Sequence, residues 1–388
     1  MKLLRVKANH FKNCSNDYTI DFVSKSRKFS EDKEYELQEV APELHVFNTM
    51  VFIGKNASGK TSAIDLLDCA YSILSEFRLE NKKYSYDGIE LEIIFYHNDF
   101  IYRYETTLGS DKLGNRAIFI NEKIHKKKYF KSKVKELYNP DTFEKVQTGF
   151  LPPFPSKTFD ELLGDNVWLP DDISSLFYIF GKKKTRAIYF DSYEDGTDTY
   201  RLLFNALKNY EIESSVLSKI LRVFDENIES LEMVDEKNYK LIFKGEEKNY
   251  TDTQLMYMLS SGTTKGLLLY VLMVASLKEG FDLLIDEVEN HFHKTLVENM
   301  ISLYKDKTVN RNNATLIFTT HYCEVLDQMG RQDNIWICKS GLHVSLSNMY
   351  EDYKIRPELL KSKQYYNNAF QTAVDYNALM NLKKVLKS

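Results

Sequence analysis

The stretch Gly54–Thr61, GKNASGKT, matches the pattern G-x-x-x-x-G-K-[ST] at every fixed position. An apolar run, LHVFNTMVFIG, leads into this stretch, and a segment with helical spacing, KTSAIDLLDCAYSILSEF, follows from its end. In a loop between a strand and a helix N-terminus, backbone N–H groups converge on phosphate oxygens. The alternative, an ordinary turn that contains glycine, does not explain why a strand and a helix flank it. The sequence therefore predicts a site for a nucleoside triphosphate.

Each position of this loop has an expected role. Gly54 and Gly59 permit the turn, Lys60 reaches the β- and γ-phosphates, and the Thr61 hydroxyl ligates Mg²⁺. The expected nucleotide-binding residues of the loop are Gly54, Lys55, Asn56, Ala57, Ser58, Gly59, Lys60, Thr61 and Ser62.

A second apolar run ends in adjacent carboxylates, at Phe281–Asn290, FDLLIDEVEN. Taken alone, an apolar strand that ends in two acidic residues is a common strand-end turn. Downstream of a phosphate loop, Asp286 is expected to hold Mg²⁺, and Glu287 to act as the general base that polarises the attacking water.

A third run, ATLIFTTH, ends at His321. Ligands of α/β proteins bind at the carboxyl ends of parallel strands, so His321 is a candidate γ-phosphate contact and catalytic residue. A metal site formed by His291, His293 and His321 is the alternative, and no second pair of ligands has the spacing that would support it.

The periodicity along the chain predicts an α/β fold with a mainly parallel sheet. Residues 1–25 and 88–109 alternate as paired antiparallel strands do, whereas strands and helices alternate after Tyr250. A lysine-rich helix is expected at HKKKYFKSKVKEL, from His125. We expect four segments: a first part of the core at 1–122, a mixed, largely helical insert or lid at 123–250, a second part of the core at 251–345, and a helical tail at 346–388.

The composition of the chain indicates its cellular compartment and whether it associates with a membrane. The chain has 388 residues, a net charge of −4 and four scattered cysteines, which favour reduced thiols in a cytoplasmic protein. No apolar region typical of a signal peptide is found at the N-terminus, and the apolar run at 266–277 is too short to span a bilayer. We therefore expect no membrane association.

The order of phosphate loop, LSSGT, LLIDE and TTH resembles the ABC-type ATPase superfamily. LSSGT matches the signature motif L-S-G-G-Q at Leu259, Ser260 and Gly262, and departs from it at Ser261 and Thr263. The segments SSGTTKG, LLIDEVENHFH and IFTTH are more similar in sequence to the RecF/SMC/OLD-like branch of stand-alone prokaryotic ATPases than to the superfamily as a whole. The segment NHFKNCSN resembles the opening strand of that branch, which makes Lys12 a candidate phosphate or ribose contact.

The resemblance implies a P-loop NTPase core with an N-terminal antiparallel β lobe and a helical insert. It also implies a homodimer or higher oligomer, in which two subunits enclose two ATP molecules and each signature loop completes the other subunit's site. Ser260, Gly262 and Lys265 would then contact the γ-phosphate in trans. The alternative is that LSSGT is an ordinary helix cap.

Two features depart from the family pattern. The nearest candidate for the glutamine that couples the lid to the nucleotide is Gln147, whose surroundings do not fit, and no proline follows His293.

The resemblance implies an ATP hydrolase that acts as a switch on a separate effector, a nuclease or toxin, in bacterial anti-phage defence. The residues after His321 are too few for a fused nuclease domain of the OLD type. The alternatives are a RecF-like ATPase that binds DNA, the nucleotide-binding subunit of a transporter, and a scaffold that binds ATP without hydrolysis. DNA or RNA binding stays open, because the basic stretches HKKKYFKSKVK and GKKKTR are explained as well by a solvated surface.

Overall fold

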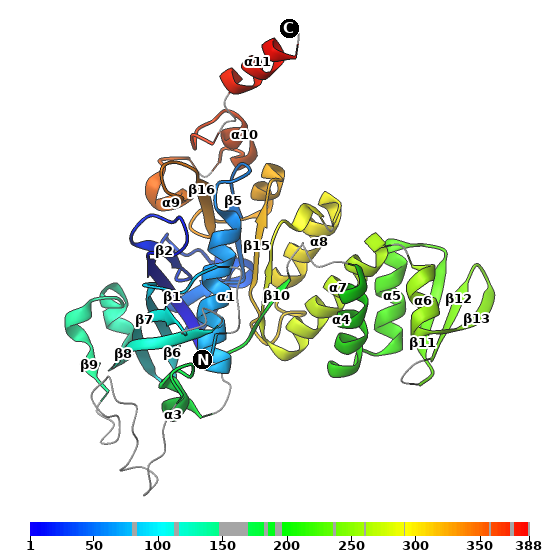
Figure 1. The fold of residues 1–388 in the computed structure, drawn as a ribbon, viewed down its shortest axis with the longest axis horizontal. Coiled ribbons are helices and arrows are strands. Elements are labelled where there is room, and N and C mark those ends of the chain that lie inside the picture. Colours follow the sequence, from blue (N-terminus) through cyan, green and yellow to red (C-terminus); the bar gives the residue numbers. More distant parts are fainter. Residues whose placement is uncertain are drawn as a thin grey trace, which may run out of the picture. The chain divides into compact units, whose positions relative to one another are not determined.

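The computed structural model describes residues 1–79, 84–111, 116–146, 170–181, 185–190, 196–235, 238–259, 261–290, 292–356, 358–372 and 376–386. The chain forms two compact units, one of Met1–Ala187 with Thr319–Ser388 and the other of Ile188–Phe318 (Figure 1). Each unit combines helices with strands, and parallel as well as antiparallel strand pairs occur. The predicted α/β class with an N-terminal antiparallel lobe is therefore confirmed.

The first unit contains a six-stranded antiparallel sheet. Its order is β2 (Tyr18–Asp21), β1 (Lys2–Asn9), β6 (Glu90–His97), β7 (Phe100–Ser110), β8 (Ala117–Lys128) and β9 (Glu144–Lys145). β6 and β7 are joined at Asn98 and Asp99, which both have positive φ, at 47° and 62°. Two such residues in a row give the tight turn that matches the twist of a hairpin.

The lysine-rich helix predicted from His125 is wrong. β8 continues as a strand to Lys128, where it pairs with Phe100 of β7, and only a short 3₁₀ helix, Lys131–Glu136, follows. The ladder with β7 decides the conformation, because β8 pairs with β7 as far as Lys128 and buries Ile124. A further 3₁₀ turn, Pro140–Thr142, leads to β9.

The second sheet region of the first unit holds β5 (Thr49–Ile53), which runs parallel to β16 (Ile335–Lys339); β17 (Ser345–Asn348) pairs antiparallel with β16. The run LHVFNTMVFIG, expected as one strand, is divided at Asn48. The Asn48 N–H donates to Glu36 O at 2.9 Å, and its side-chain amide donates to Tyr35 O at 2.8 Å. β4 (Leu44–Phe47) therefore pairs with β3 (Leu37–Ala41), after a short helical turn at Asp32–Glu36.

Helices of the first unit follow the expected apolar spacing. α1 (Lys60–Glu76) buries Ile64, Leu67 and Leu74, and it contacts both β1 and β5. The remaining helices are α3 (Leu176–Phe180), α9 (Met349–Asp352), α10 (Lys361–Tyr366) and α11 (Tyr376–Val385), with a 3₁₀ helix at Cys323–Gln328. α10 packs on that 3₁₀ helix, where Ser362 bonds to Asp327.

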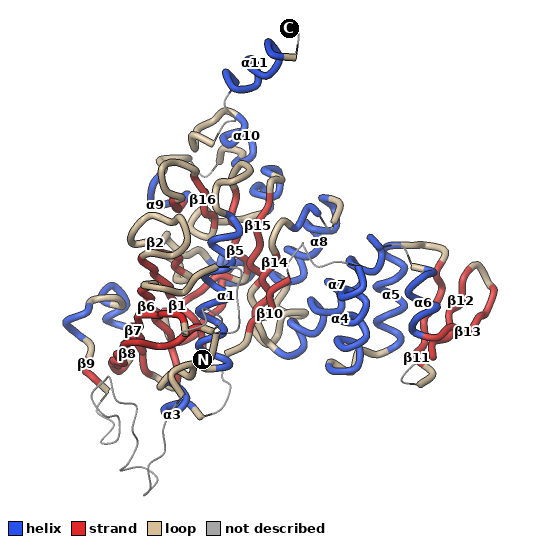
Figure 2. Tube along the Cα trace, in the orientation of Figure 1, coloured by secondary structure: helices blue, strands red, loops and turns tan. Residues whose placement is uncertain are grey.

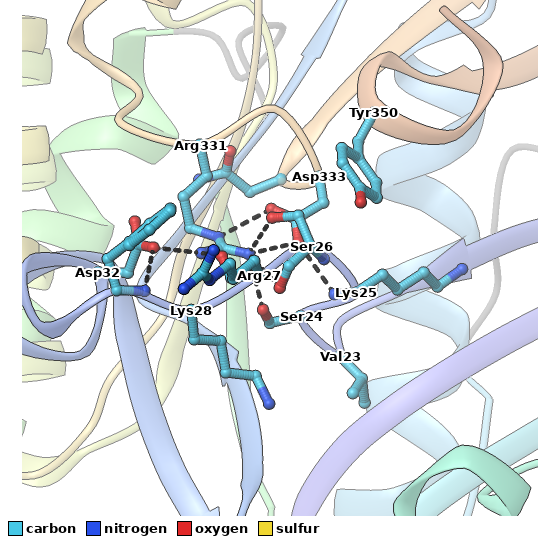
Figure 3. Close-up of polar contacts among 12 residues, drawn as sticks. Val23, Ser24, Lys25, Ser26, Arg27, Lys28, Asp32, Arg331, Asp333 and Tyr350 are labelled. Carbon is cyan, nitrogen blue, oxygen red and sulfur yellow. Dashed lines mark hydrogen bonds and ion pairs between the residues drawn. The ribbon is translucent and has the colours of Figure 1, made fainter. Parts of the chain in front are cut away.

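A buried arginine ties the loop after β2 to the start of β16 (Figure 3). The Arg331 guanidinium contacts Asp333 at 2.7 Å and Asp32 at 2.8 Å, and it donates to Ser24 Oγ at 2.8 Å. Asp333 Oδ2 also accepts the backbone N–H groups of residues 25 and 26, both at 2.9 Å. The loop is therefore held through charge-assisted bonds in the interior of this unit.

The second unit contains a helical cluster and a three-stranded meander. α4 (Gly196–Asn209) and α5 (Ser214–Phe224) contact α7 (Ser261–Glu279), and α5 contacts β11 (Ile228–Met233), as Figure 2 shows. β12 (Asn238–Phe243), β13 (Glu246–Thr251) and α6 (Asp252–Met258) complete this part. The segment 123–250, expected to be largely helical, thus contains six strands wholly or in part among its described residues.

Parallel strands supply the rest of the second unit. β14 (Asp282–Ile285) lies between β10 (Ala187–Phe190) and β15 (Leu316–Thr320), and Leu283 pairs with Leu316 in parallel register. A 3₁₀ turn, Val288–Asn290, and α8 (Lys294–Lys305) connect β14 to β15. Across the described parts of both units, none of the helices has the length and apolar content needed to span a membrane.

Candidate nucleotide site

The phosphate loop occupies the turn between β5, which ends at Ile53, and α1, which begins at Lys60. Gly59 has φ +89°, and a Cβ atom there would lie 2.1 Å from Val344 Cγ1. At Gly54 a Cβ atom would lie 2.6 Å from the carbonyl oxygen of Cys338 in β16. Both positions therefore require glycine, the first because of its left-handed backbone and close contact, the second because of its close contact alone.

The Lys60 side chain lies inside the loop and is only 5% exposed. Its ammonium donates to Gly54 O at 3.2 Å and to Lys55 O at 3.4 Å, and lies 2.8 Å from His321 Nε2. An ammonium can only donate, so in this contact Nε2 accepts and the ring proton lies on Nδ1. The structure thus brings together two residues that the sequence places 261 positions apart.

Ser58 places an unsatisfied polar group inside the loop. Its hydroxyl oxygen is buried without a hydrogen-bond partner, although most buried polar groups have one. The backbone of Ala57 has φ 59°, so this turn carries left-handed residues on both sides of Ser58, which orient successive N–H groups differently from those of a helix. Phosphate oxygens of ATP would satisfy such donors at the N-terminus of α1, which is 17 residues long.

The other predicted loop residues differ in exposure. Asn56 and Ala57 are exposed, Lys55 and Thr61 are half-buried, and Thr61 is the second residue of α1. Ser62 is half-buried and lies beside Cys14, whose thiol pKa burial raises to about 11. This Ser62 contact is one that the sequence did not indicate.

Lys12 lies beside the helix of the phosphate loop. Its ammonium forms an ion pair with Asp65 of α1 and lies 4.7 Å from the centroid of the Tyr84 ring. The backbone of Lys12 is left-handed, with φ 49°. Lys12, predicted as a nucleotide contact, thus bridges the N-terminal segment and α1 through its ammonium group. Its partners, Asp65 and Tyr84, were not identified from the sequence.

The acidic pair lies at the end of β14 in the second unit. Asp286 is fully buried, and its N–H donates to Phe190 O at 3.2 Å. Glu287 has φ 48°, an uncommon conformation for a non-glycine residue, and the Asn290 side chain donates to Glu287 Oε2 at 2.7 Å. Strained backbone of this kind occurs at functional sites, and Asn290 holds the carboxylate there in one orientation. The role of Asn290 was not recognised from the sequence.

The signature stretch continues directly into a helix. α7 begins at Ser261, earlier than the apolar run 267–277, so Gly262 lies in its first turn and Lys265 begins its second; Gly262 is exposed and Lys265 half-buried. α6 precedes it, with a capping box formed by Thr251 and Gln254.

Three residues considered from the sequence, Ser260, Gln147 and His291, lie outside the described residues. His293 caps α8, where its Nδ1 accepts the N–H of Thr295 at 3.5 Å.

Within the described ranges, no group of three or more His, Cys, Asp or Glu side chains is placed to hold a metal ion. The donors predicted for Mg²⁺, a Thr61 hydroxyl and the Asp286 carboxylate, suit an ion that keeps several waters and binds through phosphate oxygens.

Comparison with known proteins identifies the family. Residues 50–327 match the family model described as "AAA domain, putative AbiEii toxin, Type IV TA system". No curated protein sequence gives a significant match. Among solved structures, one titled "Crystal structure of the SmcHead bound to the C-winged helix domain of ScpA" aligns with a TM-score of 0.41 and 12% identity, over 89% of this chain and 97% of that chain.

The family match covers the phosphate loop, the acidic strand end and His321, and it extends over more than half of the chain. The predicted membership of the P-loop ATPases is therefore confirmed, and the chain belongs to the AAA-domain family that includes putative AbiEii-type toxins of type IV toxin–antitoxin systems.

Proposed function

We propose that this protein binds ATP with Mg²⁺, dimerises around the nucleotide and hydrolyses it as a switch that controls a separate effector. The observation that carries the proposal is the 2.8 Å contact between Lys60 Nζ and His321 Nε2 inside the phosphate loop. In this proposal Lys60 binds the terminal phosphates, and His321, which lies beside it in the first unit, contacts the γ-phosphate.

The residues have distinct roles in this proposal. Lys60 exchanges its carbonyl partners, Gly54 and Lys55, for the β- and γ-phosphate oxygens, and His321 contacts the γ-phosphate. Glu287, oriented by Asn290, accepts the proton of the attacking water. Mg²⁺ held by Thr61 and Asp286 would neutralise charge on the phosphates.

Dimerisation is proposed from the signature stretch. The first five residues of α7 include the exposed Gly262 and the half-buried cation Lys265, and none of the five is acidic. The positive end of a helix dipole with these features favours a phosphate, and in the proposed dimer that phosphate belongs to the ATP of the second copy.

Glu287→Gln tests hydrolysis. The amide keeps the shape of the side chain but accepts no proton, so phosphate release falls at least about 100-fold while ATP binding is retained. ATP should then hold the variant as a dimer in light scattering, whereas wild type returns to its nucleotide-free state. Glu229→Gln, an exposed carboxylate of β11, is the matched control. Unchanged phosphate release by Glu287→Gln excludes Glu287 as the base.

Ser260→Arg tests the signature in trans. We expect one subunit to bind ATP as wild type does, but neither dimers nor turnover to be observed, because the bulky cation blocks approach of the second copy. Ser215→Arg, at an exposed serine of α5, controls for the added charge. Normal turnover by Ser260→Arg would mean that LSSGT is only a helix cap.

The effector role, in anti-phage defence, rests on the family. Its test is phage plating on bacteria that express this chain together with the product of its neighbouring gene. Protection should require both genes and be altered by Glu287→Gln; protection by the neighbour alone would contradict control by this ATPase.

A further inference from the structure

Lysines and aromatic rings meet on the first unit where β7 begins and β8 ends. We define the basic–aromatic patch as Phe100, Lys126, Lys128, Phe130 and Lys133, which line one cavity of about 260 Å³. Its residues come from three segments, namely the start of β7, the end of β8 and the 3₁₀ helix after it.

The charge here is opposite to that of the whole chain. Residues 126–145 contain seven lysines and three acidic residues, whereas the chain as a whole has a net charge of −4. Two of those acidic residues, Glu136 and Glu144, also line the cavity. The local excess of positive charge would attract a polyanion despite the acidic average.

The ladder between β7 and β8 places rings and cations in fixed pairs. Phe100 lies directly opposite Lys128, and Lys126 Nζ lies 5.3 Å from the centroid of the Phe100 ring. Lys128 Nζ lies 5.9 Å from the centroid of the Phe130 ring, and that ring is 51% exposed. A lysine-rich surface that is only solvated does not require aromatic rings beside the lysines. Exposure of such rings to water is unfavourable in free energy.

The row of rings continues away from the cavity. Tyr102, two residues along β7, lies 6.4 Å from Phe100, and Phe180 of α3 packs edge-on against Tyr102 at 5.1 Å. Phe100, Tyr102 and Phe180 are all half-buried, so each keeps part of its ring at the surface. Rings at this spacing beside lysines match the way in which proteins bind unpaired bases and their phosphates.

Lys127 has a structural role that separates it from the patch. Its ammonium donates to Glu136 O at 2.7 Å and to Thr142 Oγ1 at 2.8 Å, and its backbone pairs with Ile101 of β7, although the residue also lines the cavity. This lysine anchors the segment that carries Phe130 and Lys133.

We propose that the basic–aromatic patch binds single-stranded nucleic acid. Bases stack on Phe100 and Phe130, while Lys126, Lys128 and Lys133 contact the adjoining phosphates. This activity is additional to the proposed ATP switch, and it requires neither nucleotide nor a second copy of the chain.

The test is fluorescence anisotropy of the full chain without ATP, using labelled oligo-dT and oligo-U of about 16 nucleotides and a duplex of equal length. We expect the single strands to bind more tightly than the duplex, and the tighter of the two homopolymers to identify DNA or RNA. Replacing Lys126 and Lys128 with Gln should make the slope of log Kd against log salt shallower by about 1.4, since each lost contact with a single strand removes about 0.7.

Stacking has its own variants. Phe130→Ala should weaken binding about tenfold, and Phe130→Tyr should restore it, because a base stacks on either ring. Lys219→Gln, an exposed lysine of α5, should bind as wild type does. Duplex binding as tight as that of single strands, or normal binding by Phe130→Ala, overturns the proposal. Because ATP is absent, these results do not depend on whether Glu287 and His321 support hydrolysis.

Discussion

Replacement of Arg331 by Met should destabilise the first unit by about 3–5 kcal/mol, because it leaves a buried carboxylate without its cation. The Arg331 and Asp333 side chains are only 2% and 1% exposed, and the guanidinium contacts Asp333 through two nitrogens, at 2.7 and 2.9 Å. Methionine matches much of the volume of the arginine chain, so the cavity formed is small and the loss is mainly electrostatic.

The predicted loss of stability depends on pH, and the direction of that dependence follows from the pKa of Asp333. Burial alone would raise the pKa of Asp333, but the hydrogen bond and charge of Arg331 outweigh it and hold the pKa below its usual range. A lowered folded-state pKa adds stability above the unfolded value of about 3.9, and that stability is lost as the pH falls through the folded value. Without Arg331 the carboxyl pKa rises, so the difference between variant and wild type should be largest at pH near 7 and shrink in acid.

Urea unfolding, followed by tryptophan fluorescence in a Trp168→Phe background that leaves Trp336 of β16 as the reporter, measures this difference close to the site. Arg116→Met is the control, since the Arg116 side chain is 63% exposed and its two ion pairs are 3.6 Å long; we expect a change of about 0–1 kcal/mol. A loss below about 1 kcal/mol for Arg331→Met at neutral pH, or one independent of pH, would refute the electrostatic reasoning.

Three further predictions concern the nucleotide site. Gly59→Ala should abolish ATP binding in isothermal titration, because the left-handed backbone costs about 1–2 kcal/mol and the new methyl group meets Val344; binding at wild-type affinity would contradict this geometry. His321→Ala should lower kcat about 100-fold with the ATP Kd little changed, as expected for a contact made mainly in the transition state; an equal loss of affinity would instead mean that it positions Lys60. Alkylation of Cys14 at pH 8, followed by mass spectrometry, should be slow in the native protein and fast in urea, since burial raises its thiol pKa to about 11; fast native labelling would show that the segment opens.

The chain carries local signals for much of its fold. The alternation in β1, β6 and β7, the spacing of α1 and the runs that became β14 and β15 all follow from neighbouring residues, whose period alone selects strand or helix. Sequence reasoning failed where a distant strand decided the outcome. The lysine run from His125 has no local feature that distinguishes a helix from a strand, and it is extended because β7 pairs with it.

The sequence by itself determined the phosphate loop, because glycine conformation and a strand–helix junction are local properties that Gly54–Thr61 carries in full. It also supplied Asp286, Glu287 and His321 as candidates. Only the tertiary structure decided that His321 meets Lys60, that Asn290 orients Glu287, and that Phe100 faces Lys128. The first and third of these contacts join residues far apart in the chain, and the second depends on the left-handed turn at Glu287; none has a period or motif that could be read beforehand.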